Sequence, residues 1–246
     1  LQFVDMRYLG SPNHVNSEYA GFFIGSGTAS VVNIQDVTFT RIGQLYSPNV
    51  LNNPTFARVT FTDPLVVGFE LQDTMQISMT GTIVGQGTYT DITLNDSIGG
   101  RLQTFMSVYG GTGPGAIVTG LVMNLTYADL TKGHRGVFLG GPGTEANPVV
   151  LSGSTLRSIP SGEAPCNYTG GDNNYYILDV QGSWIDIHDN SFLGGTIVEL
   201  EQGTRGKFYR NLITESTCIA ALFVKNSTTS RLDVYNNIIV TESSSP

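Results

Sequence analysis

The sequence has little charge, few cysteines and no long apolar run, and each shortage excludes a class of protein. Charged residues make up 13% of the 246 residues, against roughly 25% in an average soluble domain. The net charge is -8 and the basic residues are scattered, which argues against nucleic-acid binding. No run of about 18 apolar residues is present, so no membrane-spanning helix is expected.

Glycine and short polar residues take the place of the missing charges. The chain contains 30 glycines, and 40% of its residues are hydrophobic, which is enough to bury a core in one large all-β domain or two small ones. A surface of short polar side chains and turns is typical of secreted β-proteins. We therefore expect an extracellular protein, or one on the surface of a cell or virion.

Two cysteines and four Asn-x-Ser/Thr triplets are signals of secretion. The cysteines are Cys166 and Cys218, and the triplets begin at Asn95, Asn124, Asn167 and Asn226. Together they predict a glycoprotein with one disulfide. The alternative is two free buried thiols, with triplets that arise by chance in a chain rich in Asn, Ser and Thr.

An eight-residue frame recurs along the chain and predicts short stacked strands. In the stretch "WIDIHDNSF" it has the form Ile185-x-Ile187-x-Asp189-Asn190-x-Phe192. Apolar and polar residues alternate within it, and Gly, Asn or Asp breaks the alternation, which indicates strands joined by tight turns rather than helices. We place further copies at residues 32–39, 59–66, 77–84, 123–130, 149–156, 206–213 and 232–239.

Stacking of such copies predicts an all-β fold, a single right-handed parallel β-helix. Copies stacked at the strand spacing of ~4.8 Å would give a solenoid of roughly ten coils, in which each coil is stabilised by its neighbours. The units I-x-I-x-D-N-x-F and L-x-V-x-N-N-x-I resemble the repeat of pectate lyases, polygalacturonases, phage tailspikes and surface adhesins. The resemblance covers about residues 30 to 240. It implies an architecture and no catalytic residue, because the lyase and polygalacturonase signatures are absent.

One domain is expected over residues 1–246, with an entry edge at 1–30, a projecting loop at 157–180 and a tail at 241–246. The loop is predicted from its Pro, Gly and Asn content. No amphipathic helix is expected to cover either end of the stack. Exposed strand edges invite association, so we expect copies of the chain to pair head to tail or laterally.

The frame also predicts two columns of outward side chains on one face. They are Asp186–Lys207–Asp233 and His188–Tyr209–Tyr235. Three interpretations are open: a self-stabilising ladder, a face that binds a glycan or a partner through the rings, or a catalytic groove formed by the first column and His188. Glycoside hydrolysis needs carboxyl groups ~5–9.5 Å apart, and Asp186 and Asp233 would be about 9–10 Å apart, with Lys207 between them.

The turn positions predict a structural feature of their own. Asn190, Asn211 and Asn237 occupy the same place in consecutive copies. Asn tolerates left-handed backbone and bonds locally, so these side chains are expected to form an amide ladder.

The remaining candidates do not predict a metal or cofactor site. Arg205 and Arg210, with Lys207, are expected to be a solvated turn, and Asp172 a polar loop residue. His14 and His134 have no partners at metal-ligand spacing.

These observations favour a non-catalytic β-solenoid that self-assembles into an extracellular fibre or surface appendage. The alternative is a carbohydrate-binding or polysaccharide-degrading β-helix protein, tailspike-like or with lyase or hydrolase activity.

Overall fold

The chain is all-β over the residues that the computed structural model describes. These are residues 2–7, 22–23, 33–41, 45–46, 55–62, 69–70, 87–95, 104–109, 115–127, 135–140, 143–160, 176–194, 197–216, 221–225 and 231–241. Among them every strand pairing is parallel. No helix in this part of the chain is long and apolar enough to cross a membrane.

Most strands belong to one bent sheet of 15 strands. Its members are β1 (Gln2–Arg7), β3 (Asn33–Thr40), β5 (Thr55–Thr62), β7 (Thr88–Thr90), β8 (Thr93–Asn95), β10 (Ile117–Thr119), β11 (Val122–Tyr127), β13 (Val149–Ser152), β14 (Thr155–Pro160), β16 (Trp184–His188), β17 (Ser191–Gly194), β19 (Arg205–Tyr209), β20 (Leu212–Ser216), β22 (Leu232–Tyr235) and β23 (Ile238–Thr241).

A second sheet of six strands faces the first across the core. Its members are β6 (Phe69–Glu70), β9 (Thr104–Tyr109), β12 (Arg135–Gly140), β15 (Tyr176–Gln181), β18 (Ile197–Glu201) and β21 (Leu222–Lys225). A short pair is formed by β2 (Phe22–Phe23) and β4 (Leu45–Tyr46).

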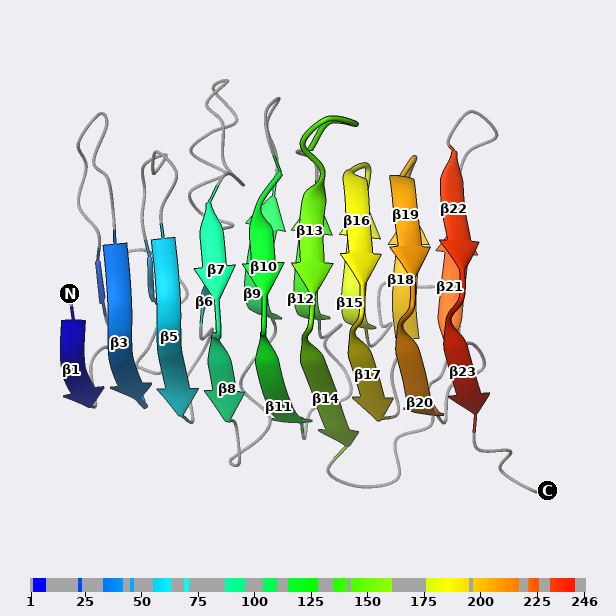
Figure 1. Ribbon diagram of the computed structural model, residues 1–246. Coiled ribbons are helices and arrows are strands. Elements are labelled where there is room, and N and C mark those ends of the chain that lie inside the picture. The colour runs from blue at the N-terminus through cyan, green and yellow to red at the C-terminus, as the bar shows by residue number, and fades with distance from the viewer. Residues whose placement is uncertain are drawn as a thin grey trace.

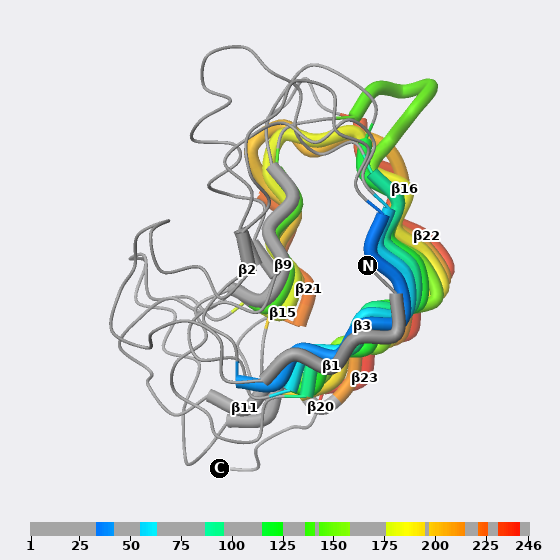
Figure 2. The backbone as a smooth tube through the Cα atoms, turned by 90° about the vertical axis from the view of Figure 1, so that its left-hand side faces the viewer, coloured from blue at the N-terminus to red at the C-terminus, as the bar shows by residue number. Residues whose placement is uncertain are grey.

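The strand order shows that equivalent strands of successive rungs lie side by side. One half of the large sheet runs β22-β19-β16-β13-β10-β7, and the six-stranded sheet runs β21-β18-β15-β12-β9-β6. Figure 1 shows the rungs in chain order across the molecule, and Figure 2 shows them superposed when viewed along the stack. This arrangement is compatible with a parallel β-solenoid, in which each rung supplies its own crossover connection.

Each rung bends sharply at the fifth and sixth positions of its frame. The first residue of this corner has positive φ in successive rungs, and these residues are Asp36, Arg58, Asp91, Gly120, Gly153, Asp189, Arg210 and Asn236. Positive φ costs roughly 1–2 kcal/mol for most residues but little for glycine. At two places an Asp and an Arg in adjacent rungs form a bidentate ion pair that accompanies the strained backbone: Arg58 with Asp36, and Arg210 with Asp189.

Apolar side chains from successive rungs fill the space between the sheets. Ile187 and Phe208 occupy the same inward position in adjacent rungs, and both are fully buried. Rings stack along the axis as well: the Phe39 and Phe61 centroids are 5.2 Å apart. The core is therefore a set of columns, as the frame predicts.

The structure corrects the register of two copies of the frame. The corner of β5 is Arg58-Val59, which moves the copy placed at 59–66 five residues toward the N-terminus. The corner between β10 and β11 is Gly120-Leu121, which moves the copy placed at 123–130 by seven residues. Apolar and polar residues alternate in the strands on both sides of a corner, so the alternation alone does not locate the corner. The copy at 77–84 lies outside the described residues.

The boundaries of the predicted loop are also too wide. Residues 157–160 belong to β14 and residues 176–180 to β15, and both strands pair with the equivalent strands of neighbouring rungs. The centre of the segment lies outside the described residues.

Truncation of a core side chain tests the columns. We expect Ile187→Ala to lower the free energy of unfolding by about 2–5 kcal/mol, because it leaves a cavity between two buried neighbours. Val234→Ala in the same column is the control. Its side chain is 42% exposed, so the loss should be well under half as large. Chemical denaturation measures both free energies of unfolding. Equal losses would contradict a core in which Ile187 is fully buried and Val234 is partly exposed.

Candidate functional site

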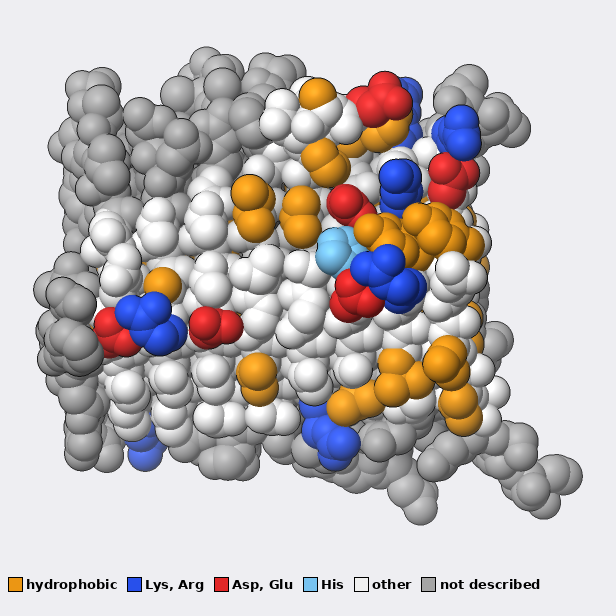
Figure 3. Space-filling model, in the orientation of Figure 1, with side chains coloured by type: hydrophobic (Ala, Val, Ile, Leu, Met, Phe, Trp, Pro, Cys, Tyr) orange, Lys and Arg blue, Asp and Glu red, His pale blue; other side chains and the backbone are white. Residues whose placement is uncertain are grey.

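Charged and hydrophobic side chains and a histidine gather on the C-terminal half of one outer face, over β16, β19 and β22 (Figure 3). The register pairs Asp186 with Lys207 and Lys207 with Asp233, so the predicted charged column is formed. Asp233 is engaged by Arg231, with two nitrogen–oxygen distances of 3.3 Å. Among the described residues Lys207 has no ion-pair partner, and Asp186 Oδ1 is buried without a hydrogen bond.

The second predicted column is a stack of rings. The ring centroids of His188 and Tyr209 are 5.1 Å apart, and those of Tyr209 and Tyr235 are 4.9 Å apart. The Arg210 guanidinium lies 4.7 Å from the Tyr209 centroid. The faces of His188 and Tyr209 are therefore turned toward each other along the axis. Burial raises the pKa of Tyr209, and the charge of Asp186 together with a hydrogen bond to it adds to that shift.

Asp189 anchors the corner beside these rings. Its carboxylate accepts two hydrogen bonds from Arg210, at 2.7 and 2.6 Å, and lies 2.7 Å from His188 Nδ1. The hydrogen bonds from Arg210, and then that from His188, hold the pKa of Asp189 well below its ordinary value. This carboxylate is fixed by its neighbours, which suits a structural clamp better than an acid–base catalyst.

The asparagine ladder runs just inside the corner. The Asn190 backbone N–H and Nδ2 both donate to Asn211 Oδ1, at 3.1 and 3.0 Å, and Asn211 donates to Asn237 Oδ1 in the same way. Asn190 and Asn211 also use the second Nδ2 hydrogen, which they donate to the Leu151 and Ile187 carbonyls. Buried amides that satisfy all their groups hold adjacent rungs in register.

A serine continues the ladder into the preceding rung. The Ser154 backbone N–H donates to Asn190 Oδ1 at 2.9 Å, and Ser154 Oγ accepts from the Leu121 backbone N–H at 3.1 Å. The same corner position is apolar further toward the N-terminus, at Val59 and Ile92. The sequence predicts the ladder only from repeated Asn residues, so it does not predict that Ser154 takes part in it.

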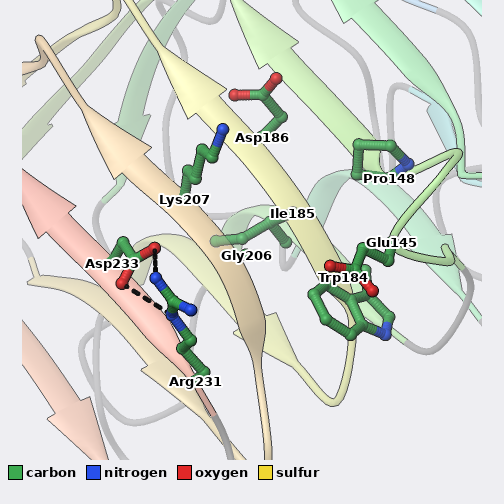
Figure 4. A pocket seen from close by; sticks show the side chains of 9 residues that line it. All are labelled: Glu145, Pro148, Trp184, Ile185, Asp186, Gly206, Lys207, Arg231 and Asp233. Atoms are coloured by element: carbon green, nitrogen blue, oxygen red, sulfur yellow. Dashed lines mark hydrogen bonds and ion pairs between the residues drawn. The ribbon is translucent and has the colours of Figure 1, made fainter.

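A pocket of about 300 Å³ lies beside the charged column. Its lining residues are Glu145, Pro148, Trp184, Ile185, Asp186, Gly206, Lys207, Arg231 and Asp233. Figure 4 shows Trp184, Glu145 and Pro148 on one side and the Arg231–Asp233 pair on the other. The predicted column residues Asp186, Lys207 and Asp233 all line it. His188, Tyr209 and Tyr235 do not.

A group of buried carboxylates lies on the six-stranded sheet. The oxygens of Asp179, Glu199 and Glu201 come within 4.8 Å of one another. Gln181 Nε2 donates to Asp179 and to Glu201, and Lys225 lies 3.9 Å from Glu201. The donor set is one that hard cations prefer. Sequence reasoning did not find it; the signal was the pair of acidic residues around Leu200 in a strand that stacks on β15.

Of the remaining predicted residues that the structure describes, Arg205 lies on β19 beside this face, and Asn95 and Asn124 lie on β8 and β11. Asn124 Nδ2 donates to Asn95 Oδ1 at 3.1 Å, so two triplets lie in adjacent rungs. Arg205 lies 5.7 Å from the Trp184 ring centroid. The other predicted residues lie outside the described residues, and they are Asn167, Asn226, Cys166, Cys218, His14, His134 and Asp172.

Comparison with protein-family models, curated proteins and solved structures finds no match to the chain. Functional proposals for this face therefore depend on its geometry.

Removal of one amide tests the ladder. We expect Asn211→Ala to cost about 3 kcal/mol, because it leaves the buried N–H groups of Asn190 without an acceptor. Asn124→Ala is a matched control, since it removes an exposed amide pair and should change stability by no more than about 0.5 kcal/mol. Equal losses in denaturation experiments would show that the ladder does not hold the rungs.

The pH dependence of stability tests the Asp189 clamp. A lowered pKa in the folded state stabilises the fold above the unfolded pKa of about 4, and this stabilisation is lost as the pH falls through the folded pKa. Asp189→Asn removes the charge and tolerates the left-handed corner. The difference in unfolding free energy between wild type and variant should be constant between about pH 5 and about pH 4.5, because both values lie above the unfolded pKa of about 4. It should shrink at lower pH. A difference that stays constant in acid would contradict the clamp.

Proposed function

We propose that the chain is a single right-handed β-solenoid of roughly ten coils that acts as a non-catalytic structural subunit of an extracellular fibre or surface appendage. Right-handedness is supported by the strong preference of parallel β crossover connections for that hand. The low charge and high glycine content support an extracellular location, as argued above.

The observation that carries the proposal is the apolar end of the described stack. Phe208 and Ile213 are buried in the penultimate rung, whereas their column neighbours Val234 and Ile239 are 42% and 46% exposed. The adjacent Val240 is exposed too. Strands β22 and β23 pair on one side only among the described residues. An apolar surface bordered by unpaired strand edges is a site for association.

The ladder supports further stacking at the same end. Asn190 and Asn211 each donate one Nδ2 hydrogen to a carbonyl of the preceding rung and another to the amide of the next rung. Asn237 Nδ2 likewise donates to the Phe208 carbonyl of the preceding rung. Among the described residues its second hydrogen lacks the next-rung acceptor that the other two have. A second copy stacked on this end would be the partner, with the strands parallel as within the chain.

The outer face supports a structural role over polysaccharide degradation. Asp189 is clamped by Arg210, and Asp233 is engaged by Arg231. Lys207 separates Asp186 from Asp233 in the column. A catalytic pair needs two carboxyl groups that face one bond, one of them free to carry a proton. The columns instead link side chains of one rung to those of the next, which stabilises a rod.

Assembly in solution tests the proposal. We expect the purified chain to form end-to-end oligomers or fibres as its concentration rises, seen by sedimentation and electron microscopy. Ile239→Lys should abolish them, because it places a charge on the apolar end while the aliphatic stem still covers the core. Ile238→Lys is the matched control, since Ile238 belongs to the outward column of the same strand, and this variant should assemble.

A chain that stays monomeric at all concentrations would refute the proposal. Assembly that Ile239→Lys leaves intact would refute the role of this end. Circular dichroism of each variant separates loss of assembly from loss of folding.

A further inference from the structure

The pocket beside the charged column is lined in part by a position of the inward column that carries no side chain. Ile185 and Leu232 lie before and after Gly206 in that column. Gly206 has φ +101°, and a Cβ there would lie 2.1 Å from the Ile185 carbonyl oxygen. Glycine is therefore required by the backbone, and Gly206 lines the pocket next to Ile185 (Figure 4).

A short arm, residues 143–148, forms one wall of the pocket and projects beyond the neighbouring rungs in Figure 2. Reciprocal hydrogen bonds between the backbones of Thr144 and Asn147, at 3.0 and 3.1 Å, close the arm. Gly143 lies against β16, where an added Cβ would be 2.7 Å from the Trp184 carbonyl oxygen. The arm thus holds Glu145 and Pro148 beside Trp184, and the wall is preformed.

The opposite wall offers an unused donor next to an unused acceptor. Lys207 has no ion-pair partner among the described residues, and Asp186 Oδ1 accepts no hydrogen bond although it is buried. The two residues are register neighbours, and the Lys207 side chain extends toward Asp186 (Figure 4). Asp233 is engaged by Arg231 and closes the far side. A hydroxyl group both donates and accepts, so it matches this pair.

The charges of the lining residues select against an anionic ligand. Glu145, Asp186 and Asp233 oppose Lys207 and Arg231, so carboxylates outnumber cations. A sugar acid or a phosphate would add negative charge, whereas a purely apolar ligand would leave Lys207 and Asp186 desolvated without partners. Trp184 supplies an amphipathic aromatic wall.

We propose that this pocket binds one unit of a neutral saccharide, with the sugar ring against Trp184 and its hydroxyl groups bonded to Asp186, Lys207 and Glu145. The glycan site predicted from the sequence thereby moves from the stacked rings, whose faces are turned toward each other, to the neighbouring pocket. A fibre that repeats this pocket would bind a polysaccharide at many points, which raises avidity without new contacts.

The sole tryptophan of the chain is Trp184, so its fluorescence reports directly on the pocket. The full chain is titrated with tri- and hexasaccharides of glucose, mannose, galactose, xylose and N-acetylglucosamine, and with a galacturonic acid trisaccharide. We expect a saturable change in emission with at least one neutral saccharide, and none or a much weaker one with the acidic sugar. Lys207→Met and Glu145→Gln should each weaken binding at least tenfold.

Asp91→Asn is the matched control, because Asp91 is an exposed acid in a rung outside the pocket, and this variant should bind as the wild type does. Binding is repeated with Ile239→Lys, which should retain it, so that loss of assembly and loss of the pocket are distinguished. The inference is overturned if no neutral saccharide changes the emission, if the acidic sugar binds more tightly, or if Lys207→Met and Glu145→Gln both bind as the wild type does.

Discussion

The left-handed corner is the constraint on which the rest of the structure depends. Strands of successive rungs stack at ~4.8 Å only if every rung bends at the same place. A rung that bent one residue later would turn its core side chains outward, because strand side chains alternate. The chain meets this constraint with glycine at Gly120 and Gly153 and with Asp, Arg or Asn elsewhere. Where Asp and Arg follow one another, the pair stabilises two strained corners together.

The residue after the corner changes in character along the stack, and with it the force that joins the rungs. Val59 and Ile92 hold the N-terminal rungs together by burial, which has no direction. Asn190 and Asn211 hold the C-terminal rungs by hydrogen bonds that accept only one register. The face with the pocket lies on this C-terminal part, where the relative position of Asp186 and Lys207 is therefore fixed by the ladder beneath it.

Sequence reasoning succeeds where the corner is marked by a polar pair. Asp189-Asn190 identifies its rung, and the side chains expected in its outward columns are the ones the structure aligns. It fails at Arg58-Val59 and Gly120-Leu121, where alternation alone suggests several registers. Arginine in a left-handed corner is unfavourable in isolation. The arginine is explained by its ion pair with the carboxylate of the preceding rung. That ion pair joins residues distant in the chain, so the local sequence does not reveal it.

The pocket could not be predicted from the frame, because several of the residues that line it depart from the frame. A repeat specifies what each rung shares, so it predicts the scaffold and the columns. Gly206 occupies a position that is otherwise apolar, and the arm at 143–148 interrupts the surface that the rungs form. Gly206 lines the pocket, and the arm supplies Glu145 and Pro148 to its wall beside Trp184. In a solenoid the departures from the repeat, rather than its best copies, are therefore the places where a binding site is to be sought.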